Sequence, residues 1–451
     1  MVNSFPAIAA AYVLLLSSDH PKLYSRYTYS EKARGTSALE YQTMNDSAAE
    51  VLSLCSGKRK VSEIIKALSD KYSEPIPKTK VYVEEFLETC LSHGYIQLHK
   101  EPINLEKRII GDSQSVIPIT AAFEITKKCP LRCKHCYNNS GLPGAKELTY
   151  EEVKLILGEL EKTGVQKVTI TGGEPFARQD SIDIIREASK RFIGVMIGSN
   201  GFYIDDRVSL ELGKINKRNG NIALQISIDG MEKAHDEIRG VIGSFSKAVE
   251  SIRLCKKNQL PVLVSMTLND SNYKDIDEVA EMCLALKVDQ LTLSATVEQG
   301  RAKGNNLLRN IGIEEIFSSI KRAKKKYLPS GLYISLDEEL ITRYENGLPL
   351  NYCGAGIDLI AVRENGDISP CVAYPLILGN MLNSSLKEIL NSEKTNLLKK
   401  IAPPSDDLCD DCELLELNCR GCNARALDLG EGVCSWAKKN SVFLKRLDSN
   451  V

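Results

Sequence analysis

Between residues 119 and 327 the sequence alternates short apolar runs with longer amphipathic segments, and this pattern limits the fold more than any other feature. Six of the apolar runs have the length and composition of strands, and they cover residues 120–126, 167–171, 194–199, 222–228, 262–268 and 291–295. The amphipathic segments between them are long enough to be helical crossovers, which parallel neighbouring strands require. We therefore expect an α/β fold with a partial (β/α)6 barrel over residues 116–335, in which residues 313–327 form the last crossover helix.

Three cysteines directly follow the first of these strands. Cys129, Cys133 and Cys136 have the spacing C-x3-C-x2-C, and loops at this end of parallel strands face the active site of such barrels. Three thiolates on one loop can ligate three irons of a 4Fe–4S cluster, which leaves the fourth iron open to another ligand. A zinc site is the alternative, but it normally needs a fourth Cys or His, and His135 between two of the cysteines is poorly placed for tetrahedral closure. We therefore predict an iron–sulfur cluster on this loop.

Charge and cysteine usage exclude several classes of protein. The 58 basic and 59 acidic residues nearly cancel, which argues against broad nucleic-acid binding and against attachment to a membrane by charge. The 14 cysteines of this large chain fall partly into tight groups, which favours metal ligation in a reducing compartment over disulfides. The apolar run at residues 5–16 has no basic residue before it and is too short to cross a bilayer. We expect it to be core structure of a soluble, cytoplasmic protein.

The spacing of the three cysteines resembles the signature of the radical S-adenosylmethionine (SAM) superfamily. Three other segments are similar to motifs of that family: Gly-Gly-Glu-Pro at 172–175, the polar ends of the third and fourth strands, and the stretch 235–240. The resemblance implies that SAM binds the open iron of the cluster. Cys129, Cys133 and Cys136 would then be the catalytic centre.

The same resemblance assigns further residues to SAM. The glycine pair with its glutamate would bind the methionine amino group, an arginine would pair with the methionine carboxylate, two serines would contact the ribose or that carboxylate, and a tyrosine would lie against the adenine. The alternatives are an ordinary turn, polar strand ends and a surface salt bridge at a helix end. In this sequence the residues concerned are Gly172, Gly173, Glu174, Arg239, Ser199, Ser227 and Tyr137.

Beyond residue 350 the regular apolar periodicity of helices and strands is lost, and the chain becomes rich in cysteine. Two Cys-x2-Cys pairs and three further cysteines resemble the SPASM domain, which carries two auxiliary 4Fe–4S clusters, so we expect this domain at 350–440 and three clusters in all. The resemblance assigns the outer cluster to Cys409, Cys412, Cys419 and Cys434, and the inner cluster to Cys353, Cys371 and Cys422. One iron of the inner cluster would be open or bound by another group. Two zinc ribbons are the alternative.

Four cysteines belong to neither group. They lie in or beside apolar helical segments, where a free cysteine behaves as a small hydrophobic residue. We expect all four to be buried core residues: Cys55, Cys90, Cys255 and Cys283.

Residues 1–103 have the pattern of a small winged-helix-like domain. Strand-like segments at 10–16, 23–29 and 95–99 enclose helical segments at 45–54, 61–72 and 80–93. This order resembles the recognition element of enzymes that mature ribosomally synthesised peptides (RiPPs), in which a leader peptide adds a strand to a sheet edge. A DNA-binding winged helix is the alternative, which the lack of a basic recognition helix disfavours.

The three domains in this order resemble the sactipeptide and ranthipeptide maturases. Segments at 123–126, 351–356 and 432–438 are similar to the subtilosin-type thioether synthases. The resemblance implies that a radical from SAM takes hydrogen from a precursor peptide, after which a cysteine sulfur bonds to that carbon. The implied partners are the precursor peptide and a reductant such as flavodoxin or ferredoxin. The alternatives are a carbon–carbon crosslink, an epimerisation, a sulfatase-type oxidation that the first domain disfavours, or a non-catalytic electron-transfer or peptide-binding protein.

Overall fold

The computed structural model describes residues 1–9, 12–16, 21–25, 41–103, 108–111, 116–144, 146–297, 299–305, 307, 313–336, 354–374, 376–405, 408–409, 412, 422–429 and 434–440. These residues divide into two compact units, one that ends at Ile117 and one that begins at Pro118. Within the described ranges, no helix has both the length and the apolar character that a bilayer crossing requires.

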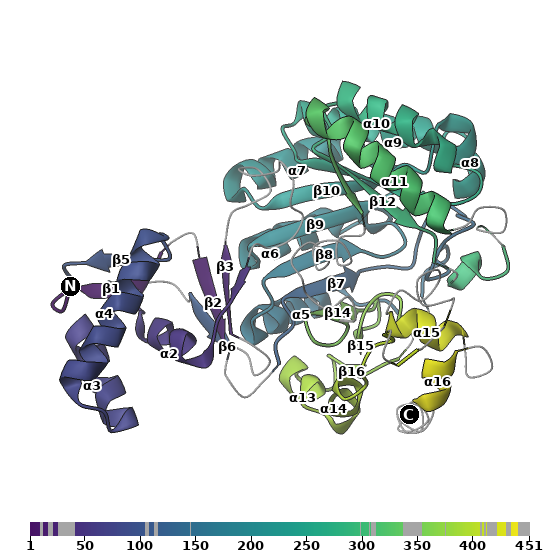
Figure 1. Ribbon diagram of the computed structural model, residues 1–451. Coiled ribbons are helices and arrows are strands. Elements are labelled where there is room, and N and C mark those ends of the chain that lie inside the picture. Colours follow the sequence, from purple (N-terminus) through teal and green to yellow (C-terminus); the bar gives the residue numbers. More distant parts are fainter. Residues whose placement is uncertain are drawn as a thin grey trace. The chain divides into compact units, whose positions relative to one another are not determined.

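The described part of the first unit packs three helices beside short strands (Figure 1). The helices are α2 (Asp46–Leu54), α3 (Val61–Tyr72) and α4 (Ile76–Ser92). β1 (Phe5–Ile8) pairs antiparallel with β5 (Ile96–His99), and a second sheet has the order β4 (Tyr41–Thr43), β3 (Lys22–Ser25), β2 (Tyr12–Leu16), β6 (Ile109–Gly111). Apolar positions at helical spacing, among them Val61, Ile64, Ile65 and Leu68, form its buried core.

The sequence pattern predicts most of this unit correctly. The helix predicted at 45–54 is present, and Asn45 caps it, since its side chain accepts a hydrogen bond of 2.8 Å from the Ala48 N–H. The third helix begins at Ile76 and not at residue 80, because Pro77 lies in its first turn, where a missing N–H costs nothing. The strands β1, β4 and β6 were not expected. Residues 10–11 and 26–29 of two predicted strands lie outside the described residues.

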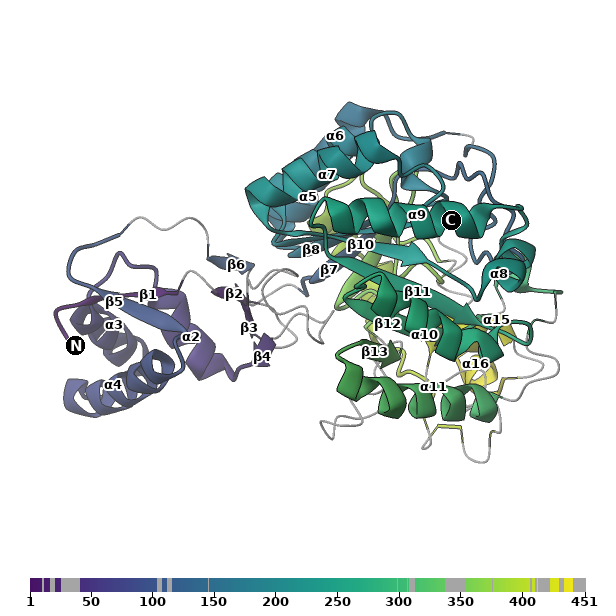
Figure 2. The same cartoon turned by 90° about the horizontal axis from the view of Figure 1, so that it is seen from above.

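The second unit is built on one large sheet of ten strands. Seven of them, β7 to β13, run parallel in chain order, as Figure 2 shows from above. They are β7 (Thr120–Glu124), β8 (Lys167–Thr171), β9 (Gly194–Ser199), β10 (Ile222–Ser227), β11 (Val262–Leu268), β12 (Gln290–Ala295) and β13 (Tyr333–Leu336). The six predicted strands correspond to β7–β12, and β13 adds a further strand after the crossover helix.

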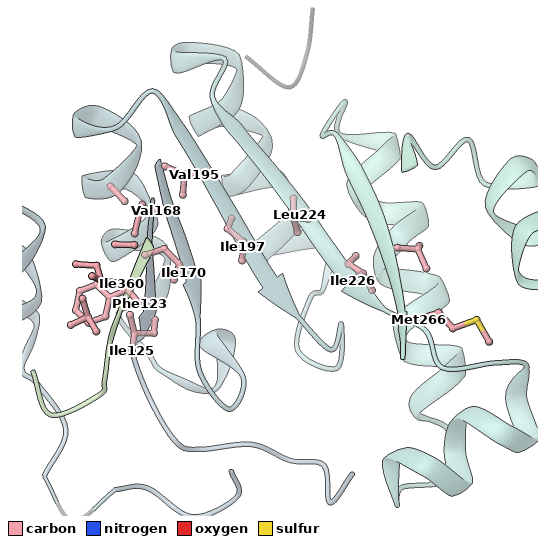
Figure 3. Packing of buried hydrophobic residues seen from close by; sticks show 14 of the residues in the cluster. Phe123, Ile125, Val168, Ile170, Val195, Ile197, Leu224, Ile226, Met266 and Ile360 are labelled. Carbon is pink, nitrogen blue, oxygen red and sulfur yellow. The ribbon is translucent and has the colours of Figure 1, made fainter. Parts of the chain in front are cut away.

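Helices connect these strands and cover one face of the sheet. They are α5 (Tyr150–Thr163), α6 (Ser181–Arg191), α7 (Asp206–Asn219), α8 (Glu232–Arg239), α9 (Ser244–Lys257), α10 (Ile276–Ala285) and α11 (Ile313–Tyr327). Alternate strand residues point toward the helices and form the core, including Val168, Ile170, Ile197 and Leu224 (Figure 3). The expected α/β fold with a parallel, partial barrel is confirmed.

The opposite face of the sheet is lined by small polar side chains. Ser227, Ser265, Thr292 and Ser335 stand in register across β10 to β13 and therefore form one row on this face. The Ser335 hydroxyl donates a hydrogen bond of 3.0 Å to Thr292 Oγ1. An apolar core and a polar row on opposite faces of one sheet leave the polar face to ligands.

The C-terminal region continues the same sheet. β14 (Leu359–Val362) runs parallel to β7 and starts an antiparallel meander with β15 (Asp367–Ser369) and β16 (Gly379–Asn380). Residues 386–399 form two helices, α13 (Leu386–Leu390) and α14 (Glu393–Lys399), because Ser392 caps the second. The last two helices are α15 (Asn423–Leu429) and α16 (Ser435–Lys439).

Candidate active site

The loop with the three predicted ligands leaves the C-terminal end of β7 and is held by its own backbone. The Cys129 N–H donates to Gly141 O at 3.1 Å, and the Gly141 N–H donates to Lys127 O at 2.8 Å. These bonds close the loop so that Cys133 and Cys136 lie within it. The sulfurs therefore have a fixed scaffold at the edge of the sheet where ligands bind in parallel α/β folds.

The glycine pair after β8 packs against this loop. The Gly173 N–H donates to Thr126 O at 2.7 Å. A Cβ on Gly172 would lie 2.3 Å from Thr126 O, and a Cβ on Gly173 would lie 2.4 Å from Lys128 O. Because any side chain would collide with backbone here, only glycine allows β8 and the cysteine loop to meet.

Glu174 is completely buried and bonded to its own chain. Its carboxylate accepts from the Ser199 hydroxyl at 2.8 and 3.0 Å, from the Asn200 N–H at 2.8 Å and from the Phe176 N–H at 3.2 Å. Burial raises the pKa of Glu174 to about 7, although the hydrogen bond from Asn200 acts in the opposite direction. Glu174 thus joins the ends of β8 and β9, and Asn200 Nδ2 lies 3.6 Å from Cys129 Sγ.

Arg239 reaches the cysteine loop from the end of α8. Its Nη1 lies 3.7 Å from Cys133 Sγ, and its Nε lies 2.7 Å from Asp229 Oδ2. Burial would raise the pKa of Asp229, but the positive charge of Arg239 acts together with smaller contributions, including the hydrogen bond from the Thr267 N–H, and lowers that pKa. Arg239 is only 7% exposed, so the alternative that it forms a salt bridge at the surface is wrong. The pair is buried.

Two histidines surround this ion pair. His135 Nε2 lies 3.4 Å from Asp229 Oδ2, and His235 Nδ1 accepts a hydrogen bond of 3.1 Å from the Asp229 N–H. Burial lowers the pKa of His235 to about 4 and also lowers the pKa of His135. Both rings are therefore neutral near pH 7, and Arg239 carries the positive charge beside Cys133.

A turn after β12 holds the cysteine loop from the other side. Arg301 donates from Nε to Cys133 O at 3.0 Å and from Nη1 to Ser140 O at 2.7 Å, and its N–H donates to Cys136 O at 2.8 Å. Gly300 has φ +57°, and a Cβ there would lie 2.3 Å from the carbonyl oxygens of Cys136 and Tyr137. We did not predict this turn from the sequence, because no local sequence pattern indicates its contact with the cysteine loop.

Tyr137 connects the cysteine loop to the C-terminal region. Its hydroxyl donates to Glu124 Oε1 at 2.9 Å, and Asn138 Nδ2 donates to the same oxygen at 3.1 Å. Arg363, which follows β14, donates from Nη1 to Glu124 Oε2 at 2.7 Å and from Nη2 to Val372 O at 3.0 Å. Burial raises the pKa of Tyr137 well above its usual value, so the hydroxyl keeps its proton and remains a donor.

The donor set fits an iron–sulfur cluster. Burial raises the pKa of Cys129 to about 12 and raises that of Cys133, so these thiols lose their protons only to a metal. The nearby Asn200 amide and Arg239 guanidinium are hydrogen-bond donors of the kind that thiolate sulfur accepts. Among the residues that the structure describes, no three His, Cys, Asp or Glu side chains are gathered closely enough for a single metal ion.

The C-terminal cysteines are only partly described. Cys353 and Cys419 lie outside the described residues. Cys409 and Cys434 are buried, the Cys412 N–H donates to Cys409 O at 2.9 Å, and burial raises the pKa of Cys409. Cys371 lies in the loop that follows β15, and Cys422 precedes α15. The four remaining cysteines are buried as predicted: Cys55, Cys90, Cys255 and Cys283.

The structure brings most of the predicted cofactor residues to one edge of the sheet, but it separates the two serines. Ser199 pairs in register with Ile226 and so lies on the helix side of the sheet, whereas Ser227 belongs to the polar row on the opposite face. Asp229, two residues after Ser227, was not predicted as a site residue. Glu124 and Arg363 were missed because 239 residues separate them in sequence.

Family models match three parts of the chain. They are the radical SAM superfamily at residues 123–283, the SPASM iron–sulfur cluster-binding domain at residues 353–413, and coenzyme PQQ synthesis protein D (PqqD) at residues 31–96. Each match falls on one of the regions distinguished above.

Curated relatives align with most of the chain. The sporulation killing factor maturation protein SkfB of Bacillus subtilis is 29% identical over 70% of this chain and 75% of its own length. The subtilosin biosynthesis protein AlbA of the same organism is 26% identical over 90% of both chains. A PqqA peptide cyclase of Rhodopseudomonas palustris is 27% identical over 69% of this chain and 84% of its own.

A solved structure shares the fold over nearly the whole length. SuiB of Streptococcus suis, bound to its precursor peptide SuiA, aligns with a TM-score of 0.68 over 94% of this chain and 97% of its own, at 14% identity.

Proposed function

This chain combines a PqqD domain, a radical SAM domain and a SPASM domain in one RiPP maturase, and from that premise we propose that it installs thioether links between cysteine sulfur and carbon in a ribosomally synthesised precursor peptide. The observation that carries the proposal is the alignment with a subtilosin biosynthesis protein over 90% of both chains. We further propose the domain limits 1–103, 116–335 and 350–440.

Cys129, Cys133 and Cys136 would hold the radical SAM cluster. When bound, this cluster and SAM together supply a carbon radical that removes a hydrogen atom from the peptide. The chain's own part is to fix the three sulfurs, which it does through the backbone bonds of the loop, the glycine pair after β8 and the Arg301 turn. Fixed geometry keeps the reacting atoms close and water out.

The SAM-binding residues form a second part of the proposal. The cysteine loop carries Tyr137, whose ring is anchored by Glu124. Ser227 lies on the polar face of the sheet, where a cofactor has access, whereas Ser199 and Glu174 support that surface from within. Arg239 brings a positive charge to the edge of the loop, which suits a carboxylate ligand. The backbone of Gly172 and Gly173 stays free of side chains at the same edge.

The C-terminal cysteines would hold two auxiliary clusters, which gives three 4Fe–4S clusters in all. We propose that Cys409, Cys412, Cys419 and Cys434 ligate the outer one. The hydrogen bond of 2.9 Å from the Cys412 N–H to Cys409 O, which holds these two residues side by side, supports this assignment. Cys353, Cys371 and Cys422 would ligate the inner one. A small reductant protein such as flavodoxin or ferredoxin would supply the electron.

Mass spectrometry tests the function directly. Reconstituted protein is incubated without oxygen with SAM, a reductant and a cysteine-bearing precursor peptide encoded beside its gene. Thioether formation predicts 5′-deoxyadenosine, loss of two hydrogens from the peptide for each link, and cysteines that resist alkylation. A product with the same mass loss but alkylable cysteines would contradict the thioether and keep the radical enzyme.

The alignment with a PqqA peptide cyclase favours a second candidate. In this case the same radical closes a carbon–carbon link in the peptide and the cysteines take no part. Replacing each precursor cysteine by serine separates the two functions, because it abolishes a thioether and leaves a carbon–carbon link intact.

A further inference from the structure

A cavity of about 400 Å³ lies between the cysteine loop and the strands that follow β14. Tyr137 and Asn138 line it on the side of the cysteine loop, Gly300 lines it from the turn after β12, and Glu364, Asp367 and Tyr374 line it from the C-terminal region. Its volume is in the range of sites that bind small ligands or single groups of a larger one. The cavity adjoins the loop that carries Cys136, but none of the predicted cluster-ligating cysteines is among its lining residues.

Glu364 is the unusual side chain of this cavity. The residue is only 6% exposed, and its Oε1 lies 3.5 Å from Lys127 Nζ. Its Oε2 is buried and has no hydrogen-bond partner among the described residues. A buried acceptor without a donor costs free energy, so such an atom in a cavity indicates a donor that arrives with a ligand.

The other charged groups of the cavity are already engaged. Glu124 accepts from Tyr137, Asn138 and Arg363. Arg363 also donates to backbone carbonyls, including Tyr374 O at 3.2 Å, and Asp367 accepts from Asn380 Nδ2 at 2.8 Å. These bonds hold the side chains that line the cavity in place. Among the described lining residues, they leave Glu364 as the acceptor for a ligand.

The chain also makes room for this carboxylate. A Cβ on Gly144 would lie 2.8 Å from Glu364 Oε1, so a larger residue there would displace the side chain. The Leu148 N–H also donates to Glu364 O at 2.8 Å and holds the backbone in place. The position of Glu364 is thus set by several elements and does not depend on its own side-chain bonds.

We propose that this cavity binds the core segment of the peptide substrate and that Glu364 Oε2 accepts a hydrogen bond from an N–H or O–H group of it. The inference rests on the proposed function and adds a specificity-determining residue to it. Three carboxylates, those of Glu124, Glu364 and Asp367, line the cavity together with Lys127 and Arg363, so its charge favours a hydrogen-bond donor that carries no negative charge. The carboxylate oxygen would repel an acidic peptide side chain at the same position.

Two variants of the full-length, reconstituted enzyme test the proposal. Glu364→Gln keeps the shape and removes the charge, and Glu250→Gln is the control, because Glu250 is an exposed residue on α9 with a 55% exposed side chain. Binding is measured by fluorescence anisotropy with a labelled precursor whose cysteines are serine, so that no turnover intervenes. Turnover is measured with the natural precursor, and 5′-deoxyadenosine formation is measured with SAM alone.

We expect Glu364→Gln to raise KM for the precursor and the Kd of the serine precursor about ten-fold, because a hydrogen bond to a charged acceptor becomes a weaker one to a neutral amide. The rate of 5′-deoxyadenosine formation without peptide should match that of wild type and Glu250→Gln. Unchanged Kd and KM would contradict the role of Glu364 but not the proposed function. A variant that loses only SAM cleavage would lead to the same conclusion. A wild-type enzyme that binds the serine precursor but leaves the natural one unmodified would instead contradict the proposed function.

Discussion

Glu124 Oε2 and Arg363 Nη1 lie 2.7 Å apart and join the end of β7 to the segment after β14. The Glu124 side chain is 1% exposed and that of Arg363 is 16% exposed, so removal of one partner leaves the other charge buried. The same glutamate anchors Tyr137. This pair therefore connects the cysteine loop to the strands that follow it.

Glu124→Gln should lower the stability of the second unit by about 3 kcal/mol, the usual cost of an unpaired buried charge. Thermal unfolding measures this change. Glu151→Gln is the control, since the 73% exposed side chain of Glu151 makes a surface ion pair with Lys154, and such pairs contribute well under 1 kcal/mol. Equal unfolding temperatures for the two variants would show that Glu124 and Arg363 are not coupled.

Gly300→Ala should disrupt the cysteine loop, because its Cβ would lie 2.3 Å from Cys136 O. We expect the iron content per chain after reconstitution to fall by about the iron of one cluster, and the rate of 5′-deoxyadenosine formation to fall at least ten-fold. Iron analysis and chromatography measure these changes.

Gly304→Ala is the matched control for this variant. Gly304 also has positive φ, +91°, but a Cβ there would meet no atom within 4 Å. It should cost only the backbone strain of about 1 kcal/mol and keep its iron. If both variants kept full activity, the collision at Gly300 would not constrain the loop.

Cys129→Ala should abolish SAM cleavage, since the sulfur is a proposed cluster ligand, and should keep the iron of the auxiliary clusters. Cys255→Ala is the comparison. This buried cysteine of α9 has a pKa raised by burial to about 12, and its loss should cost about 1 kcal/mol of stability without loss of iron. SAM cleavage at the wild-type rate by Cys129→Ala would refute the assignment.

Glu174 should make stability depend on pH. Its pKa is about 7 in the folded chain and 4.5 as a free side chain, so the folded state binds the proton more tightly. Stability contributed by the protonated form is complete below pH 4.5 and is lost as pH rises toward 7. Relative to Glu174→Gln, the wild-type chain without cofactors should lose about 3 kcal/mol across this window.

The measurement is the difference in unfolding temperature between the two chains at a series of pH values. Glu211→Gln serves as the control, because the Glu211 side chain is 34% exposed and Lys214 lowers its pKa. A difference for Glu174→Gln that stays constant between pH 4.5 and 7 would contradict the buried, proton-binding carboxylate.

Local patterns in the sequence predict the positions of strands β7–β12, the helices α2, α3 and α11, and the burial of the four unassigned cysteines. These features follow from local periodicity and capping: residues 61–72 repeat their apolar positions at helical spacing, and Asn45 offers its side chain to the first turn of α2. The cysteine spacing also placed the loop at the end of the first barrel strand.

The contacts between polar groups around that loop could not be predicted from the sequence, because they depend on how the chain folds. Ser199 and Ser227 end neighbouring strands, yet register places them on opposite faces of the sheet. Arg363 reaches Glu124 because β14 pairs with β7 across more than 230 residues of chain, and Gly300 is required only by the carbonyls that the fold brings beside it. Local sequence encodes backbone conformation, whereas these contacts depend on long-range pairing that closes only when the whole sheet has formed.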